Sequence, residues 1–224
     1  MDKGKACRSN LLDSVLDDLR FQIINREILA GTFLAEETLS EEYGISRGSI
    51  RTVLSFLEQE GLIEILPNGR RRVHGFSEED ALTCWELRTY LECTAVKRIL
   101  ASHASYIGKV SELISKIGTD IPTDRKLDAA TSIAVDMEIH RALMASVDNK
   151  LLLNTWNNLS HVLEALMKIN AKDWYQEEYV STLRESHMPL FLALLQGDPA
   201  AADLMVSHID RAKEISIAAF HSMK

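Results

Sequence analysis

The chain has 224 residues, 46% of them hydrophobic and 26% charged, and its formal net charge is −8. This composition is typical of a globular protein with one large or two small domains, and the lack of any run of 18 apolar residues excludes a membrane-spanning segment. Three scattered cysteines are too few for a disulfide framework or a zinc ribbon. Residues 1–10 are polar and lack the apolar stretch of a signal peptide, so we expect a flexible N-terminus and a cytoplasmic protein.

Residues 11–75 are predicted to form a first domain. Its first helix is expected over residues 11–30 and a shorter one over residues 39–43, after which Gly44 is free to adopt the left-handed conformation that closes a helix. Ser46 is suited to cap the next helix. The apolar stripe of that helix consists of Ile50, Val53, Leu54 and Leu57. Two helices joined by such a tight turn form a helix-turn-helix, whose second helix presents its first turn to the DNA major groove.

A small hairpin is predicted directly after the helix-turn-helix. Residues 62–66 form its first strand, residues 67–69 its turn and residues 70–73 its return strand. The candidate DNA contacts of the recognition helix and the hairpin are Ser46, Arg47, Ser49, Arg51, Arg70, Arg71 and Arg72. Residues 1–75 nevertheless carry ten basic and twelve acidic side chains, so the salt-dependent part of DNA affinity should be modest. A winged module that contacts only protein is the alternative.

From Ser77 onward, every periodic segment is predicted to be helical. The expected helices span residues 78–102, 106–117, 127–146, 150–171, 174–196 and 199–223. Asp198 is suited to cap the last of them, with Pro199 at its first position. Residues 76–224 should therefore form an antiparallel bundle. The fold class predicted for the whole chain is mostly α, with a winged helix-turn-helix followed by an all-α domain.

Four polar residues fall on the inward faces of these helices. Asp136 and His140 are four positions apart, so they share one face with apolar neighbours. His187 and His208 each lie about ten residues from the turn at Gly197, roughly 15 Å along their helices, and therefore at one level of an antiparallel hairpin. One carboxylate and three imidazoles form a ligand set for a divalent transition metal, with zinc first and nickel or manganese as alternatives. A hydrogen-bonded core cluster without metal is the competing interpretation.

Two further polar residues have open interpretations. Arg88 falls on an inward stripe, where an arginine needs an anion. The partner within the chain would be Glu92, one turn later, or a carboxylate from another helix. The alternative partner is the carboxylate of a bound effector. His161 belongs to the polar stripe of its helix, so it is either a solvated residue or an additional metal ligand.

Part of the first domain resembles the winged helix-turn-helix of GntR-family bacterial transcription regulators. The resemblance rests on residues 44–54, GISRGSIRTVL, and on residues 57–61, LEQEG. Pro67 and Val73 keep the spacing of that family's wing, whereas its glycine is displaced, so that Arg70 takes the usual glycine position. Glu37 stands where some relatives carry a DNA-contacting arginine. The resemblance implies an operator-binding protein.

The predicted bundle resembles the FCD effector domain, which accompanies winged helices in the FadR-type subfamily. Residues 86–92, ELRTYLE, and residues 136–143, DMEIHRAL, carry this resemblance together with two later histidines. In that family an aspartate and three histidines bind a metal, and small carboxylates bind against it. Carried over, the resemblance assigns the metal to Asp136, His140, His187 and His208, and the effector contact to Arg88.

These patterns predict a ligand-responsive transcription regulator, in particular a repressor, and not an enzyme. It would bind double-stranded operator DNA as a homodimer, because one recognition helix covers only a few base pairs. A small carboxylate effector would change operator affinity by a coupling free energy. Two rivals stay open. One is a metal-dependent hydrolase on a helical scaffold, because the same ligand set could activate water. The other is a helical adaptor that binds protein through its winged module.

Overall fold

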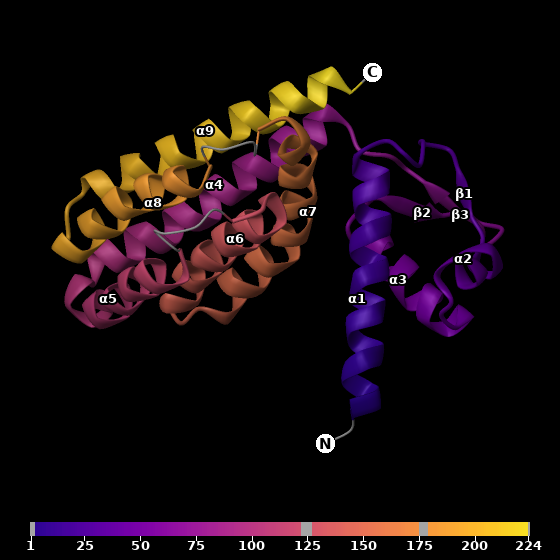
Figure 1. The fold of residues 1–224 in the computed structure, drawn as a ribbon, viewed down its shortest axis with the longest axis horizontal. Helices are drawn as coiled ribbons and strands as arrows, with labels where there is room; N and C mark the ends of the chain where they lie inside the picture. Colours follow the sequence, from indigo (N-terminus) through magenta and orange to yellow (C-terminus); the bar gives the residue numbers. More distant parts are fainter. Residues whose placement is uncertain (1–2, 122–126, 175–178, 224) are drawn as a thin grey trace. The chain divides into compact units, whose positions relative to one another are not determined.

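The computed structural model describes residues 3–121, 127–174 and 179–223. The chain divides between Ser77 and Glu78 into two compact units, here called the winged unit and the helical unit (Figure 1). The domain boundary expected after residue 75 falls close to this division. Among the described residues, no helix combines the length and the apolar character needed to cross a membrane.

The winged unit combines helices with a small antiparallel sheet. Its elements are α1 (Lys3–Ile24), β1 (Phe33–Leu34), α2 (Glu36–Tyr43), α3 (Arg47–Gln59), β2 (Ile63–Ile65) and β3 (Arg71–Val73). In the sheet β3 lies between β1 and β2, with Phe33 opposite Arg72 and Ile63 opposite Val73. The sequence does not predict β1, because two residues are too few to show an alternating pattern. The predicted hairpin is thus the larger part of a three-stranded wing.

The helix-turn-helix forms as its turn residues predict. Gly44 closes α2 with a φ of 63°, and the side chain of Ser46 accepts a hydrogen bond from the amide of Ser49 at 3.1 Å. The apolar stripe of α3 is fully buried. α2 begins at Glu36, earlier than expected, and places two glutamates in its first turn, where they suit the positive end of the helix dipole.

The ends of α1 differ from the prediction. The helix begins at Lys3, inside the segment expected to be flexible, and it stops at Ile24 instead of continuing to Gly31. Arg26 adopts the left-handed conformation with a φ of 59°. The amides of Arg26 and Glu27 then bond back to carbonyls of the last turn at 3.1 and 2.8 Å, which is the Schellman closure of a helix. The sequence instead predicts that the helix ends at Gly31, because an arginine rarely adopts the left-handed conformation.

The helical unit is a bundle in which one helix is central. Its elements are α4 (Glu78–Ala101), α5 (His103–Asp120), α6 (Ala129–Ser146), α7 (Lys150–Trp174), α8 (Tyr179–Gln196) and α9 (Ala200–Ser222). They follow the predicted helices in order, and the described part of this unit contains no strand. Two helices are longer than predicted: α5 extends beyond the predicted residues 106–117 at both ends, and α7 continues to Trp174, past the break expected after residue 171. Residues 175–178, predicted to belong to the next helix, lie outside the described residues. The side chain of Asp198 accepts from the amide of Ala200 at 2.9 Å and so caps α9 as expected. α4 packs against each of the other helices, so polar groups on its inner face are buried (Figure 1).

A buried ion pair joins α1 to the end of the recognition helix α3. Arg20 is 2% exposed, and its Nε and Nη2 donate to the two carboxylate oxygens of Glu60, both at 2.7 Å. Arg20 also contacts Asp17, whose side chain is about half exposed. Bidentate pairs of this kind are among the strongest side-chain hydrogen bonds. The pair therefore fixes the C-terminal end of α3 against α1.

We expect Glu60→Ala to destabilise the winged unit by about 3 kcal/mol, because the substitution leaves the buried charge of Arg20 without its bidentate partner. Native-state hydrogen exchange of the α1 and α3 amides measures the change in this unit alone. Asp17→Ala removes a more exposed carboxylate from the same arginine and is the matched control, with an expected cost below about 1 kcal/mol. Equal exchange protection in the parent and in Glu60→Ala would contradict this role of the pair.

Candidate functional site

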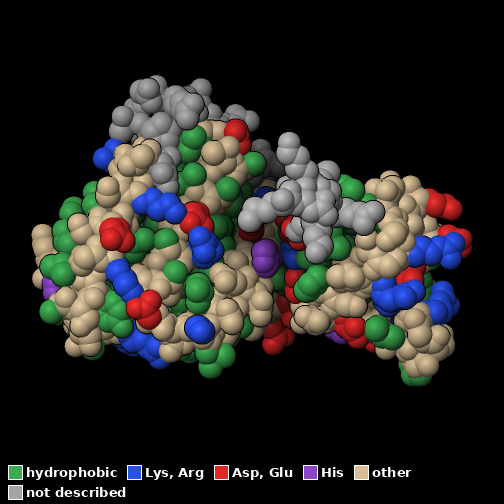
Figure 2. Space-filling view, turned by 90° about the horizontal axis from the view of Figure 1, so that it is seen from below, with side chains coloured by type: hydrophobic (Ala, Val, Ile, Leu, Met, Phe, Trp, Pro, Cys, Tyr) green, Lys and Arg blue, Asp and Glu red, His purple; other side chains and the backbone are tan. Residues whose placement is uncertain are grey.

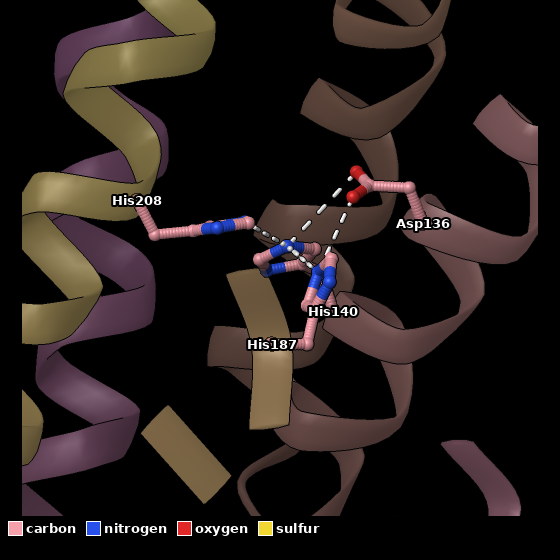
Figure 3. A group of neighbouring side chains, drawn as sticks. All are labelled: Asp136, His140, His187 and His208. Carbon is pink, nitrogen blue, oxygen red and sulfur yellow. Dashed lines mark hydrogen bonds and ion pairs between the residues drawn. The ribbon is translucent and has the colours of Figure 1, made fainter. Parts of the chain in front are cut away.

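The four predicted metal ligands come together inside the helical unit. Asp136 and His140 lie on α6, His187 on α8 and His208 on α9, and their side chains point toward one centre (Figure 3). Each residue offers a ligand atom, and these atoms all lie within 4.8 Å of one another. The first three residues are buried and His208 is partly exposed. The structure thus brings together residues that are up to 72 positions apart in the sequence.

The histidine rings meet through their Nε2 atoms. Nε2 of His140 lies 3.0 Å from Nε2 of His208 and 3.2 Å from Nε2 of His187. Nε2 of His187 lies 3.2 Å from Oδ1 of Asp136. The ring centroids of His187 and His208 are 4.5 Å apart, as expected for two residues at one level of the α8–α9 hairpin. A single ion placed among these atoms would be within reach of all four side chains.

The hydrogen bonds of Nδ1 in two imidazoles determine whether Nε2, which faces the centre of the cluster, carries a proton or a lone pair. Nδ1 of His140 lies 2.6 Å from Oε2 of Glu92, and Nδ1 of His187 lies 2.6 Å from the carbonyl oxygen of Leu183. Carboxylate and carbonyl oxygens only accept, so each Nδ1 donates a proton and each Nε2 of the neutral ring presents a lone pair. Two such lone pairs at 3.2 Å, beside the carboxylate of Asp136, repel one another. A cation removes this repulsion, so the donor set fits a divalent metal.

Burial and charge shift the pKa values of His140, His208 and Asp136 in the direction that favours metal binding. Burial lowers the pKa of His140, and the charge of Arg88 lowers it further. Burial, together with the two neighbouring histidines, also lowers the pKa of His208 well below its usual value. For Asp136, burial opposes ionisation, but its contacts with His187, His140 and Arg88 outweigh burial and hold its pKa far below the usual range. Neutral imidazoles and an ionised carboxylate are the forms that bind metal.

Glu92 supports the cluster from α4. Its buried carboxylate accepts from Nδ1 of His140, from Nε of Arg88 at 2.9 Å and from Nε1 of Trp156 at 2.9 Å. Burial raises its pKa, but Arg88 and His140 reverse that effect and lower the pKa to about 2. A carboxylate behind a ligating histidine fixes the ring and increases its basicity. The sequence indicates Glu92 only as a partner of Arg88, because its contact with α6 depends on how the helices pack.

Arg88 lies between the two buried carboxylates. Its side chain is 1% exposed, and its Nη2 lies 3.7 Å from Oδ2 of Asp136 in addition to the contact with Glu92. Of the partners left open by the sequence, the structure confirms Glu92 and also places a carboxylate from another helix, that of Asp136, beside Arg88. Contact with an effector stays a prediction.

The other described histidines lie outside the cluster. His161 is exposed on α7, so of its two interpretations the structure favours the solvated residue. His74 and His221 are also exposed, and His103 is half-buried with Nε2 3.0 Å from the carbonyl of Leu195.

The predicted DNA contacts of α3 and the wing differ in exposure. The side chains of Arg47 and Arg51 are each more than half exposed, whereas that of Arg71 is 15% exposed. Only Arg70 lies in the hairpin turn, and its guanidinium stacks 3.6 Å above the ring of Phe33. The other two wing arginines belong to β3, within the predicted return strand.

Glutamates accompany most of these arginines. Figure 2 shows Lys and Arg side chains lying among Asp and Glu side chains on the winged unit, toward the right of the view. The ion pairs are Arg47 with Glu37, Arg51 and Arg71 with Glu36, and Arg72 with Glu64. The sequence gives the acidic balance of this region but not these pairings, because the partners are 8 to 35 positions apart.

Two family models match this chain. The model of bacterial regulatory proteins of the gntR family matches residues 11–73, and that of the FCD domain matches residues 84–211, more than half of the chain. The chain belongs to the GntR family. Both resemblances drawn from the sequence are therefore confirmed, and the two matched segments coincide with the winged and the helical unit of this GntR-family protein.

Named relatives are distant in sequence. The gluconate operon transcriptional repressor of Bacillus subtilis is 25% identical over 163 residues, which are 72% of this chain and 65% of that protein, just under two thirds of its length. The probable D-xylose utilization operon transcriptional repressor of Paenarthrobacter nicotinovorans is 25% identical over 205 residues, 90% of this chain and 86% of that protein. The solved structure of Escherichia coli McbR/YncC, 18% identical, shares the fold with a TM-score of 0.65 over 92% of this chain and 96% of that chain.

We expect added zinc to raise the melting temperature of this GntR-family protein in a concentration-dependent way. An ion present at a hundred times its Kd adds about 2.7 kcal/mol to the stability of the folded state. Thermal melting with zinc and then with excess chelator measures the gain and its reversal. His187→Ala should abolish the response, whereas His161→Ala, at an exposed histidine, should keep it. Melting curves unchanged by metal and by chelator would show that the four residues form a hydrogen-bonded core cluster instead.

Proposed function

We propose that this protein is a transcriptional repressor that binds operator DNA through its winged unit and a small organic acid through a metal in its helical unit. It would act in the cytoplasm, where bacterial DNA lies. The observation that carries the proposal is the convergence of three imidazoles and a carboxylate in the unit that follows a helix-turn-helix. The names of the gluconate and xylose operon repressors support the assignment to a repressor of a metabolic operon.

Zinc is the first candidate for the metal, with nickel or manganese as alternatives. Asp136, His140, His187 and His208 would supply its protein ligands. Once bound, the ion would act as a Lewis acid that offers a further coordination position to an anion. The lone pairs that meet at the centre of the cluster support this proposal, because a cation bound there removes their mutual repulsion.

A small carboxylate is the proposed effector. The positive charge of Arg88 lies beside the cluster, 3.7 Å from Asp136, and adds to the attraction that a metal exerts on an anion. Nε1 of Trp85 and Oγ of Ser132 are buried, and neither has a hydrogen-bond partner among the described residues. Trp85 lies about one helical turn before Arg88 on α4, and Ser132 lies about one turn before Asp136 on α6. Such groups suit the polar end of an acid whose carboxylate faces the metal.

The recognition helix α3 is the proposed base reader. Arg47 and Arg51 would contact base edges, with Ser46 and Ser49 near the phosphates and the wing arginines along the backbone. The protein is proposed to act as a homodimer on a pseudo-palindromic operator, because one such helix covers only a few base pairs. Sedimentation at micromolar concentration should give a dimer, and a monomer that still binds a single half-site would contradict this.

Catalysis is not proposed. A hydrolase would need a general base that is free to take a proton from water. Glu92, the carboxylate in contact with His140, is already engaged by Arg88 and Trp156 as well. Turnover of esters or phosphoesters by the metal-loaded protein would favour the hydrolase alternative.

We predict that Arg47→Ala and Arg51→Ala each weaken operator binding by about 1–3 kcal/mol, the value of one arginine at a base edge. Both side chains are exposed, so the fold should be unaffected. A gel shift against the DNA that flanks the protein's own gene measures the loss. Lys97→Ala, which removes an exposed positive charge from the helical unit, is the control and should bind as the parent does. Parent-like affinity in both arginine variants would mean that α3 does not read the operator.

A second prediction separates sensing from DNA binding. His208→Ala should lose the metal and the effector response together, yet still bind the operator, because the winged unit keeps its own core. The measurements are elemental analysis and a gel shift titrated with small mono- and dicarboxylic acids, gluconate among them. His161→Ala should respond as the parent does. An effector response that survives in metal-free His208→Ala would place the effector site elsewhere.

A further inference from the structure

Glu36 contacts both DNA-facing parts of the winged unit. It is the first residue of α2, and its carboxylate accepts from Nε and Nη2 of Arg51 on α3 at 3.1 and 2.8 Å. The same carboxylate accepts from Nη1 of Arg71 on β3 at 2.7 Å. Glu36 is 20% exposed and Arg71 15% exposed. One acidic side chain therefore links the recognition helix to the wing through three charge-assisted hydrogen bonds.

The contact leaves one edge of the Arg51 guanidinium available. Glu36 occupies the side edge, formed by Nε and Nη2. The end edge, formed by Nη1 and the second hydrogen of Nη2, can still donate two parallel hydrogen bonds to O6 and N7 of a guanine. The Arg51 side chain is 64% exposed, so it is accessible to DNA. Arg51 can thus be held by Glu36 and read a base at the same time.

We propose that Glu36 is a positioning residue for base recognition, which holds Arg51 in its reading orientation and fixes the wing beside it through Arg71. The inference rests on the proposed DNA-binding function. A free arginine loses rotamer freedom when it docks on a base, and Glu36 removes much of that loss before DNA arrives. Its negative charge also opposes the phosphates of any DNA. Both effects favour the correct sequence over unrelated sequences.

The wing provides a matched control for the charge of Glu36. Glu64 pairs with Arg72 across the neighbouring strands β2 and β3, through Nε and Nη2 at 2.9 and 2.7 Å. Both of these side chains are well exposed, and the pair joins two positions within the wing. Glu64→Gln therefore makes the same change of charge on the same unit without touching the link between α3 and the wing.

The test compares the sequence preferences of full-length variants. The parent, Glu36→Gln, Glu64→Gln and Arg51→Ala each select duplexes from a randomised DNA library, and the selected pools are sequenced. Affinities for the parent's preferred duplex and for an unrelated duplex are then measured at one salt concentration. We expect Glu36→Gln to lose preference at the same base pair as Arg51→Ala, and its ratio of specific to unrelated affinity to fall about tenfold or more. Glu64→Gln should keep the ratio within about twofold.

A double variant tests whether Glu36 acts through Arg51. Glu36→Gln should cost no further preference at that base pair when Arg51→Ala is already present. Circular dichroism checks that every variant keeps the parent's helix content. An unchanged ratio in Glu36→Gln, an equal fall in Glu64→Gln, or an additive loss in the double variant would each overturn the inference. A parent that selects no sequence at all would overturn the proposed function instead.

Discussion

The helical unit has to accommodate a buried polar cluster in which two imidazoles already donate their Nδ1 protons. The Nδ1 protons of His140 and His187 are donated outward, to Glu92 and to the carbonyl of Leu183, so the Nε2 atoms that meet at the centre carry lone pairs. That arrangement depends on the packing of α4 against α6, which places Glu92 behind His140. It also depends on the α8–α9 turn, which sets His187 and His208 at one level.

In both units a glutamate holds other polar side chains in place. In the helical unit, Glu92 of α4 holds Arg88 and a histidine in place, and in the winged unit Glu36 of α2 holds two arginines. In each unit, the supporting carboxylate reaches groups on other elements: Glu92 contacts His140 of α6, and Glu36 contacts Arg51 of α3 and Arg71 of β3. Rigid support of this kind lowers the entropy lost when a ligand binds, at the cost of burying or pairing charge.

Local pattern was enough to predict most of the fold and the four clustered residues, but not their supports. The 3.6-residue period puts Asp136 and His140 on one face, and the equal distances of His187 and His208 from the Gly197 turn put them at one level. Turn chemistry likewise located α3 through Ser46. Other features depend on tertiary contacts, which no periodicity reports. The contact of Glu92 with α6 and the pairing of the arginines predicted to contact DNA are of this kind. The left-handed Arg26 and the two-residue β1 have no sequence pattern of their own.

The ion pairs around the recognition helix also affect how such a regulator is distributed in a cell. A genome offers about 10⁶–10⁹ unspecific sites that compete for a DNA-binding protein. A strongly basic DNA-binding protein is mostly bound at these unspecific sites, so the cell must make many copies for one operator to be occupied. In this winged unit, Arg51, Arg71 and Arg72 already face glutamates, and residues 1–75 are slightly acidic overall. We therefore expect fewer molecules to be held by bulk chromosome, so that fewer copies are needed to keep one operator occupied.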